Sequence, residues 1–426
     1  MARGLAVTPP PVTRRAIVAG VAAVALGAPA LAQQARGKVV VVGGGFGGAT
    51  CARALRRAGF EVVLVEPEST YTACPFSNAV IAGLRGMEEQ RFGYDALRRE
   101  GVAVVHQAVM ALEADEQRVA LADNTKIRYD RLVLAPGIDL RFDALPGYDA
   151  DAAEAMPHAW KAGAQTELLR RQLEAMEDGG TVVMSVPANP YRCPPGPYER
   201  ASLIAYYLKT RKPRSKIIVL DAKDAFSKQR LFQAAWASLY PGLLEYVPLS
   251  AGGAVTEVHL ETRTISTDFG DHQASVANVI PPQRAGRIAQ VAGVADRSGW
   301  CPIDPVSFES RLRPGVHVIG DAAIAGAMPK SAFSANAQAK VCAEAVASLL
   351  RDEAPAPPKL INTCYSLVAP DYGISIAGVY HPANGLLADV EGAGGTSPLD
   401  APLPVRALEA RYAEDWFRTA TADVFG

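Results

Sequence analysis

The chain has 426 residues, and its 49% hydrophobic content is enough for a large core in two or three domains. Its 43 basic and 44 acidic residues nearly cancel, which gives no electrostatic reason to expect nucleic acid or an anionic membrane as partner. The six histidines are scattered without the short spacings of a local metal site, so no metal is predicted.

Residues 1–32 predict an export signal of the twin-arginine type, with a general secretory signal as the alternative. Arg14 and Arg15 precede the weakly hydrophobic run AIVAGVAAVALGAPAL, and an A-x-A type cleavage site ends at Ala32. The run is short for a membrane span and contains glycine and proline, so we expect a periplasmic protein without an integral span. The periplasm is oxidising and permits disulfides among the six cysteines.

Residues 38–66 carry a dinucleotide-binding fingerprint in its proper context. The strand KVVVV, the loop GGGFGG, a helix and the strand EVVLVE follow one another. Gly43 permits the tight turn, Gly45 lets the backbone approach a pyrophosphate, and Gly48 allows the helix to pack closely on the strand. Glu66 ends the second strand, where a ribose hydroxyl would be met. The free N–H groups of the helix would bind the phosphates.

Two later segments indicate that the dinucleotide is FAD. YDRLVLAPG (129–137) and GVHVIGDAA (315–323) are strands that end in small-residue turns. They resemble the FAD-binding parts of the flavoprotein superfamily with two dinucleotide domains. That resemblance implies that Asp321, beside Gly320, holds the ribityl and pyrophosphate region. A helix N-cap is the plainer role for Asp321.

Residues 151–279 repeat the strand and helix pattern, but their first loop differs. In the superfamily this inserted domain binds NAD(P)H through a second glycine fingerprint. Here the loop reads PANPYRCPPGPYER, in which prolines remove N–H donors and Tyr191, Arg192 and Tyr198 crowd the phosphate position. The sequence therefore predicts that the pyridine nucleotide site is lost and that electrons reach the flavin by another route.

The elements together predict an α/β fold with two Rossmann-like dinucleotide-binding domains, as in glutathione reductase, and a smaller C-terminal α+β domain. In the last part of the chain, alternating Tyr, Ile and Val predict strands, and the final helix should be amphipathic, with Leu408, Tyr412 and Trp416 on one face. The predicted parts are an export signal (1–32), a discontinuous FAD domain (37–150 and 280–357), the NAD(P)H-domain-like insert (151–279) and a C-terminal interface domain (358–426).

Several motifs spread from residue 37 to the C-terminus form a specific set: YTACPFSN, RCPPGPYERAS, FSKQ, GWCPID, VHVIGDA, NTCYSL and PDYGIS. The chain resembles the flavoprotein subunit of flavocytochrome c sulfide dehydrogenase. The resemblance implies a periplasmic FAD enzyme that oxidises hydrosulfide to elemental sulfur or polysulfide. Electrons would pass to a c-type cytochrome subunit in a heterodimer. No CxxCH haem attachment motif occurs in the chain, so the haem would belong to the partner.

The resemblance also implies roles for individual residues. A redox disulfide beside the flavin would join Cys193 to Cys364, although a structural cross-link is the alternative. Glu199 would move the substrate proton, or would simply be a carboxylate at a helix N-terminus. Cys74 would carry FAD through a thioether to its 8α-methyl group, or would be an unmodified loop cysteine. Trp416 would lie near the flavin, or in the helix core.

The remaining cysteines are predicted to be structural. Cys51 and Cys342 fall in helices rich in alanine and valine and are expected to be small buried thiols, and Cys301 has no clear redox role. Two rival functions stay open, a membrane-bound sulfide:quinone reductase and a non-catalytic FAD-binding scaffold subunit of sulfur oxidation. An NAD(P)H-dependent disulfide oxidoreductase is disfavoured, because the second glycine fingerprint is missing and no CxxxxC pair follows Glu66.

Overall fold

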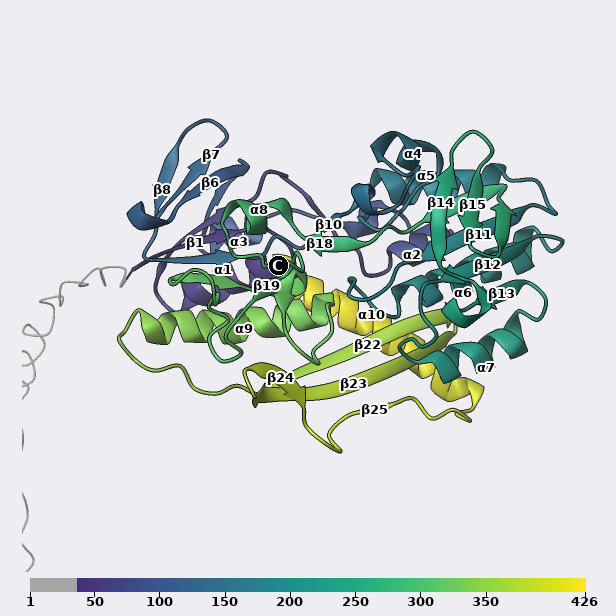
Figure 1. The fold of residues 1–426 in the computed structure, drawn as a ribbon. Coiled ribbons are helices and arrows are strands. Elements are labelled where there is room, and N and C mark those ends of the chain that lie inside the picture. Colours follow the sequence, from purple (N-terminus) through teal and green to yellow (C-terminus); the bar gives the residue numbers. More distant parts are fainter. Residues whose placement is uncertain (1–36) are drawn as a thin grey trace, which may run out of the picture.

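The computed structural model describes residues 37–426, and the predicted export signal at 1–32 lies outside the described residues. Two parallel sheets with helices, and an antiparallel hairpin that contacts both regions, make up the fold (Figure 1). This arrangement confirms the predicted α/β class. None of the helices between residues 37 and 426 is long and apolar enough to cross a bilayer.

The first sheet is built on the predicted fingerprint. Its five parallel strands run in the order β20 (Val316–Val318), β9 (Arg131–Leu134), β1 (Lys38–Val42), β2 (Glu61–Val65), β5 (Ala103–Val105). Val39, Val40 and Val41 of β1 are fully buried, because a parallel strand covered on both faces is apolar along its whole length. Helices α1 (Phe46–Arg57) and α9 (Ala332–Leu349) pack against each other beside this sheet (Figure 1).

The second sheet has four parallel strands in the order β13 (Leu244–Val247), β12 (Lys216–Asp221), β11 (Thr181–Val186), β17 (Val276–Val279). Helix α6 (Gly196–Arg211) follows β11, and helix α7 (Gln229–Leu239) follows β12. The crossover from β11 through α6 to β12 is the local unit of a Rossmann-like fold.

The C-terminal part is a long antiparallel hairpin of β22 (Leu360–Ala369) and β23 (Tyr372–Ala383), with helix α10 (Leu403–Phe425) packed on it. Strand β22 contacts α6 of the second region and α9 of the first (Figure 1). The hairpin therefore joins the two sheet regions and presents residues of β22 to the space between them.

The prediction that Leu408, Tyr412 and Trp416 form the apolar face of the last helix is wrong. Leu408 and Tyr412 are 43% and 47% exposed, while Ala410, Ala413 and Phe417 are buried. A Cβ atom at Gly373 of β23 would lie 2.4 Å from the backbone nitrogen of Ala410, so strand and helix approach too closely for a large side chain. The small residue Ala410 therefore faces Gly373 at the closest approach of helix and strand, while Leu408 and Tyr412 are exposed.

Shorter elements complete the fold. The remaining helices are α2 (Ser77–Ile81), α3 (Asp95–Arg99), α4 (Ala150–Ala155), α5 (Ala164–Ala175) and α8 (Arg287–Val291). The remaining strands are β3 (Tyr71–Thr72), β4 (Arg91–Phe92), β6 (Val109–Glu113), β7 (Arg118–Leu121), β8 (Lys126–Arg128), β10 (Ile138–Leu140), β14 (Val255–His259), β15 (Thr264–Thr267), β16 (Gly270–Gln273), β18 (Gln283–Ala285), β19 (Cys301–Pro302), β21 (Ala323–Ile324), β24 (Leu386–Asp389) and β25 (Gly395–Thr396).

Candidate active site

A cavity of about 460 Å³ collects nearly all the predicted site residues. Its walls come from the glycine loop after β1, the loop before α6, strand β22 and helix α10. The predicted site residues that line it are Gly43, Gly45, Glu66, Cys74, Cys193, Glu199, Gly320, Asp321, Cys364 and Trp416. Residues far apart in the sequence thus meet at one place.

Gly48 is the predicted site residue that does not line the cavity, and its role is packing. A Cβ atom at Gly48 would lie 1.8 Å from the carbonyl oxygen of Gly43, and one at Gly43 would lie 2.3 Å from the carbonyl oxygen of Ala135. Gly43 also has a φ of 101°, which disfavours any side chain. Helix α1 starts directly behind this loop, with no side-chain cap and no acidic residue in its first turn. Its N–H groups are thus free to bind a phosphate.

Two carboxylates flank this anion site. The Glu66 side chain accepts hydrogen bonds from the backbone N–H groups of Gly44, at 2.7 Å, and Glu68, at 3.0 Å, so its position at the end of β2 is fixed. Asp321 is different, because its Oδ1 atom is buried without a hydrogen-bond partner. Burial raises the pKa of Asp321, while nearby Arg192 and Lys330 act in the opposite direction.

Asp321 is not the helix N-cap that its plainer interpretation predicted. It lies inside the 3-10 turn Gly320–Ala322, whose cap is Ile319. A buried acceptor that faces the cavity without a donor is suited to the hydroxyl groups of a ribityl chain or ribose. Together with the glycine loop and the free helix N-terminus, Asp321 makes the described residues fit FAD.

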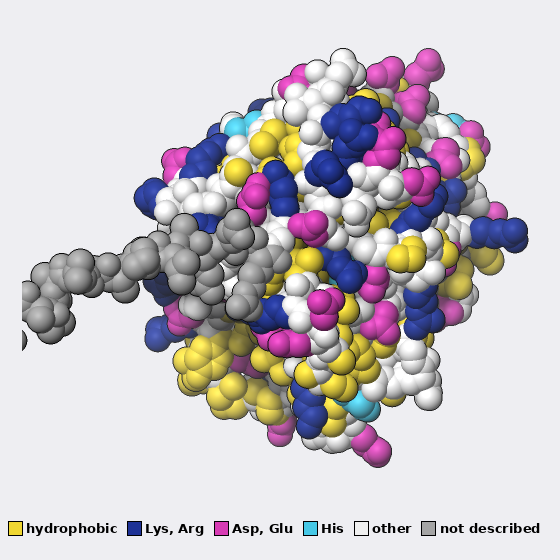
Figure 2. Space-filling view, turned by 90° about the vertical axis from the view of Figure 1, so that its left-hand side faces the viewer, with side chains coloured by type: hydrophobic (Ala, Val, Ile, Leu, Met, Phe, Trp, Pro, Cys, Tyr) yellow, Lys and Arg dark blue, Asp and Glu magenta, His cyan; other side chains and the backbone are white. Residues whose placement is uncertain are grey.

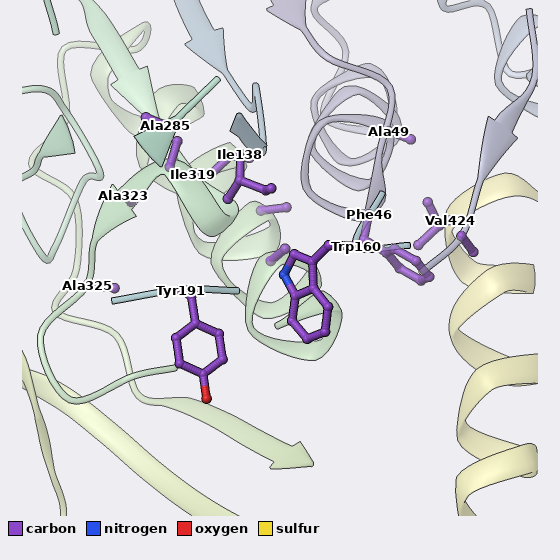
Figure 3. Packing of buried hydrophobic residues seen from close by; sticks show 14 of the residues in the cluster. Phe46, Ala49, Ile138, Trp160, Tyr191, Ala285, Ile319, Ala323, Ala325 and Val424 are labelled. Carbon is purple, nitrogen blue, oxygen red and sulfur yellow. The ribbon is translucent and has the colours of Figure 1, made fainter. Parts of the chain in front are cut away.

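The rest of the cavity wall is largely apolar. Figure 3 shows Ile138, Ile319, Phe46 and Trp160 reaching this region from different elements. Trp416 of α10 also lines the cavity and stacks on Phe333, with ring centroids 5.9 Å apart and an interplanar angle of 14°. An apolar wall of this kind suits a flat aromatic ring system.

The two predicted redox cysteines line the cavity from opposite parts of the chain. Cys193 has a left-handed backbone with φ 57°, and its N–H donates to the carbonyl of Lys330 at 2.7 Å. Cys364 is a buried residue of β22, and the Nδ2 atom of Asn362 donates to its Sγ at 3.4 Å. Burial raises the pKa of Cys193, and the neighbouring Cys364 raises it further.

All six cysteines are free thiols in this structure, so the disulfide between Cys193 and Cys364 stays a prediction. Cys51 in α1 and Cys342 in α9 are fully buried, which confirms their expected placement. Cys301 in β19 is fully buried too. Cys74 lines the cavity and its Sγ lies 3.9 Å from the carbonyl oxygen of Trp160.

Glu199 lies in the first turn of α6, and its side chain points inward. Its Oε2 accepts from Asn78 Nδ2 and its Oε1 from the backbone N–H of Leu367, both at 2.8 Å. Burial raises the pKa of Glu199, and these hydrogen bonds limit the rise. Glu199 therefore lies near a helix N-terminus and also lines the cavity.

The sequence did not indicate the roles of three buried side chains around the site, which are Asn78, Arg200 and Lys228. Arg200 donates to Asn78 Oδ1 at 2.9 Å and to the carbonyl of His158 at 2.8 Å, and its guanidinium lies 5.0 Å from the centre of the Trp160 ring. Asn78 thus links Arg200 to Glu199. Lys228 donates to the carbonyl of Cys364 at 2.9 Å. The motifs ERA and FSKQ contain Arg200 and Lys228, but nothing local shows where their side chains reach.

The carboxyl ends of the second sheet are filled by aromatic side chains. Tyr198 donates to Asp221 Oδ2 at the end of β12 at 2.6 Å and stacks on Phe226 with centroids 3.6 Å apart. Tyr246 also donates to this oxygen, at 3.1 Å. In Rossmann-like folds this edge of the sheet holds the nucleotide phosphates. The packing supports the prediction that the loop no longer forms a phosphate site.

This fold and this cavity define a flavin-binding, two-domain oxidoreductase of the pyridine nucleotide-disulphide oxidoreductase type, whose family model matches residues 37–177. The model of the central part of the sulfide dehydrogenase [flavocytochrome c] flavoprotein chain matches residues 166–281. The model of the flavin-binding part of flavocytochrome c sulphide dehydrogenase matches residues 356–425. The chain belongs to the flavocytochrome c sulfide dehydrogenase flavoprotein family.

Two individual proteins are similar to this chain in sequence. The chain is 58% identical over 45 residues to the sulfide dehydrogenase [flavocytochrome c] flavoprotein chain of Chlorobaculum thiosulfatiphilum, a match of 10% of this chain and 94% of that sequence. It is 27% identical over 300 residues to mitochondrial sulfide:quinone oxidoreductase of Mus musculus, covering 67% of this chain and 65% of the relative. The chain thus spans slightly less than two thirds of the mouse protein.

A solved structure shows the same fold. The sulfide:quinone oxidoreductase of Aquifex aeolicus superposes with a TM-score of 0.72 at 16% sequence identity, over 91% of this chain and 92% of that chain. At this identity the likeness establishes the architecture and no more.

Proposed function

We propose that this protein is a periplasmic sulfide dehydrogenase flavoprotein subunit. It oxidises hydrosulfide through Cys193, Cys364 and FAD to elemental sulfur or polysulfide and passes the electrons to a c-type cytochrome subunit. The observation that supports this proposal best is the meeting of Cys193 and Cys364 in the cavity that also contains the glycine loop and Asp321. A dithiol pair beside a flavin site can replace the nicotinamide as the source of electrons.

The cysteines carry the sulfur chemistry. Hydrosulfide attacks one sulfur of a Cys193–Cys364 disulfide, which leaves a persulfide on one cysteine and a thiolate on the other. In the step after this attack, Glu199 would take the proton that hydrosulfide brought, since its buried carboxyl has a raised pKa and lines the same cavity. When bound, FAD supplies a two-electron acceptor for the sulfur that is oxidised.

Different residues of the cavity would hold different parts of FAD. The loop at Gly43 and Gly45 and the start of α1 would bind the pyrophosphate, Glu66 a ribose hydroxyl, and Asp321 the ribityl region. Cys74 would form the thioether to the flavin. We expect the flavin to stay with the protein after acid denaturation and to be released from Cys74→Ser, which absorbance of the precipitated protein measures. Release from both proteins would contradict the covalent link.

A quinone is the second candidate acceptor. The relatives from mouse and Aquifex aeolicus are named sulfide:quinone oxidoreductases. Helix α10 also exposes Leu403, Leu408 and Tyr412, a surface that could meet either a membrane or a partner protein. Acidic residues of the same helix, among them Asp415 and Glu414, make an anionic membrane the poorer partner.

A spectral titration tests the proposal and separates its rivals. Sulfide added anaerobically to the purified protein should bleach the flavin absorbance. Oxidised cytochrome c should then restore it, and a soluble ubiquinone analogue should restore it much more slowly. A flavin that sulfide leaves unchanged would favour the non-catalytic scaffold, and faster recovery with the quinone would favour the quinone reductase.

A further inference from the structure

Lys228 is a buried lysine that reaches the cysteine pair from the second sheet region. It precedes α7 with a left-handed backbone, φ 62°, and only 7% of the residue is exposed. Its side chain leaves α7 and contacts the C-terminal hairpin. The Nζ atom donates to the carbonyl of Cys364 at 2.9 Å, to Ser366 Oγ at 2.8 Å and to the carbonyl of Ile374 at 3.5 Å.

All three of these partners are neutral. Within residues 37–426, Lys228 forms no ion pair, whereas the nearby buried Lys223 lies 2.5 Å from Asp221. A buried ammonium held only by neutral oxygens keeps part of its desolvation cost, and a new anion nearby would reduce that cost. The surroundings of Lys228 are thus suited to an anion that forms during a reaction.

The titratable groups that act most strongly on the Lys228 ammonium are all acidic. They are Cys364 of β22, Glu199 of α6, Cys193 of the preceding loop and Glu409 of α10. Burial lowers the pKa of Lys228 to about 8, and Cys364 is the strongest of the groups that raise it.

The two carboxylates among these groups already have partners. Glu199 is bound by Asn78 and Leu367, and Glu409 by Ser375, Ser397 and Arg406. The sulfur pair is therefore the place where a new negative charge without a balancing cation can appear.

We propose that Lys228 stabilises the thiolate of Cys364 that forms when hydrosulfide opens the Cys193–Cys364 disulfide. This inference rests on the proposed function. Hydrosulfide brings one negative charge and bonds to Cys193, keeping its hydrogen as a persulfide. The bond between the two cysteines breaks, and its electron pair goes to Cys364 as the thiolate. No charge is created or lost in this step, so one buried cation suffices to balance it.

The choice of Cys364 as the thiolate is supported by the hydrogen bonds. Lys228 donates to the backbone carbonyl of Cys364, and none of the three hydrogen bonds of its Nζ goes to residue 193. Burial also raises the pKa of Cys193, which disfavours a thiolate there. Lys228 thus acts as a positioning and electrostatic residue, and Cys193 is left as the sulfur that is attacked.

Alkylation of the reduced full-length holoprotein tests this assignment without relying on turnover. The protein is reduced anaerobically and treated with iodoacetamide over a pH series, and mass spectrometry measures the labelling rates of the Cys364 and Cys193 peptides. In the wild type, Cys364 should react at lower pH than Cys193. In Lys228→Met the midpoint for Cys364 should rise by about 1 pH unit or more, as expected when an adjacent opposite charge is removed.

Three variants separate charge from structure. Lys228→Arg should keep most of the wild-type profile because it keeps the charge. Ser366→Ala removes one neutral partner of Nζ and should leave the midpoint unchanged. Lys209→Met makes the same substitution at an exposed lysine that binds the carbonyl of Leu239, and should also leave it unchanged.

The possible outcomes are distinct. Equal Cys364 midpoints in the wild type and Lys228→Met would overturn the inference. If Lys228→Met does not fold, the wild-type protein still tests the inference. Labelling of Cys193 at the same pH as Cys364, or at a lower pH, would overturn the inference too. A wild type whose flavin sulfide does not bleach would refute the proposed function, whereas normal bleaching with unchanged midpoints would refute only the role of Lys228.

Discussion

Cys193 shows how strongly the loop before α6 is shaped around one sulfur atom. Its left-handed φ of 57° is unfavourable for a residue with a side chain, and the contact with Lys330 holds it there. A Cβ atom at Gly196 would lie 2.9 Å from Cys193 Sγ, so a glycine is needed at that position. The backbone of this loop is therefore constrained so that it places a thiol at the position where other Rossmann-like domains have a phosphate-binding loop.

The cysteine pair provides the first prediction. Cys193→Ser and Cys364→Ser should each abolish bleaching of the flavin by sulfide, because neither can form the disulfide that hydrosulfide attacks. Bound flavin should remain, since other residues are expected to hold it. Cys342→Ser, in α9 away from the cavity lining, is the control and should keep the response. Full turnover in both cavity variants would exclude the disulfide route.

Glu199 provides the second prediction. Because burial raises its pKa, the basic form is present only above a value higher than that of an ordinary carboxyl group, and the bleaching rate should fall as the pH drops through it. Glu199→Gln should slow bleaching by about 100-fold and remove this acidic limb. Glu167→Gln, at a partly exposed position in the first turn of α5, is the matched control. A rate and pH profile like those of the wild type in Glu199→Gln, measured by stopped flow, would exclude Glu199 as the base.

At the scale of elements, strand β22 is the part on which the site depends most. It supplies Cys364, donates the Leu367 N–H to Glu199 and accepts the ammonium of Lys228. It also pairs with β23 over most of its length, with Cys364 opposite Ile376. A shift of this strand would move the Cys364 sulfur relative to Glu199 and Lys228 and would strain the hydrogen bonds that join the strand to both.

The third prediction concerns the packing of α10 on this hairpin. Gly373→Ala would place a Cβ atom 2.4 Å from the backbone of Ala410, and because the obstacle is backbone the helix must move. We expect a loss of about 1 to 3 kcal/mol in the free energy of unfolding, measured by denaturant titration. Gly395→Ala, where a Cβ atom would meet nothing within 4 Å, is the control. Equal stability of the two variants would show that the helix is not closely fitted to the strand.

At the scale of the whole molecule, the surface has no dominant charge on the face seen in Figure 2, where basic and acidic side chains are interspersed. This agrees with the formal net charge of −1. Long-range electrostatic attraction is thus a weak guide to the partner, and short-range apolar contact, such as that offered by α10, becomes the better candidate.

The fourth prediction concerns export. If residues 1–32 are a twin-arginine signal, the protein crosses the membrane after it has folded around its flavin. Arg14→Lys combined with Arg15→Lys should then leave a flavin-containing precursor in the cytoplasm, detected by cell fractionation and fluorescence. Arg3→Lys, outside the pair, should not change export. A double variant exported as well as the wild type would favour the general secretory route.

Local chemistry made much of this protein predictable. The glycine loop, the acid at the end of β2 and the replaced phosphate loop depend on backbone and side chains a few residues apart, so the sequence indicated them directly. One local prediction was wrong, the apolar face of α10, and the alternative role of Asp321 as a helix N-cap does not hold either. For α10, the close contact with Gly373 of β23 decided which face is buried. For Asp321, the short turn begins one residue earlier, at Gly320.

By itself, the sequence determined the α/β class, the flavin fingerprint and the family, because those depend on patterns within single segments. The tertiary structure alone decided which side chains surround the sulfurs. Lys228 and Cys364 are separated by 136 positions, and Glu199 and Leu367 by 168. Contacts over such separations leave no local pattern, since they exist only where the packing of α6, α7 and β22 brings the segments together.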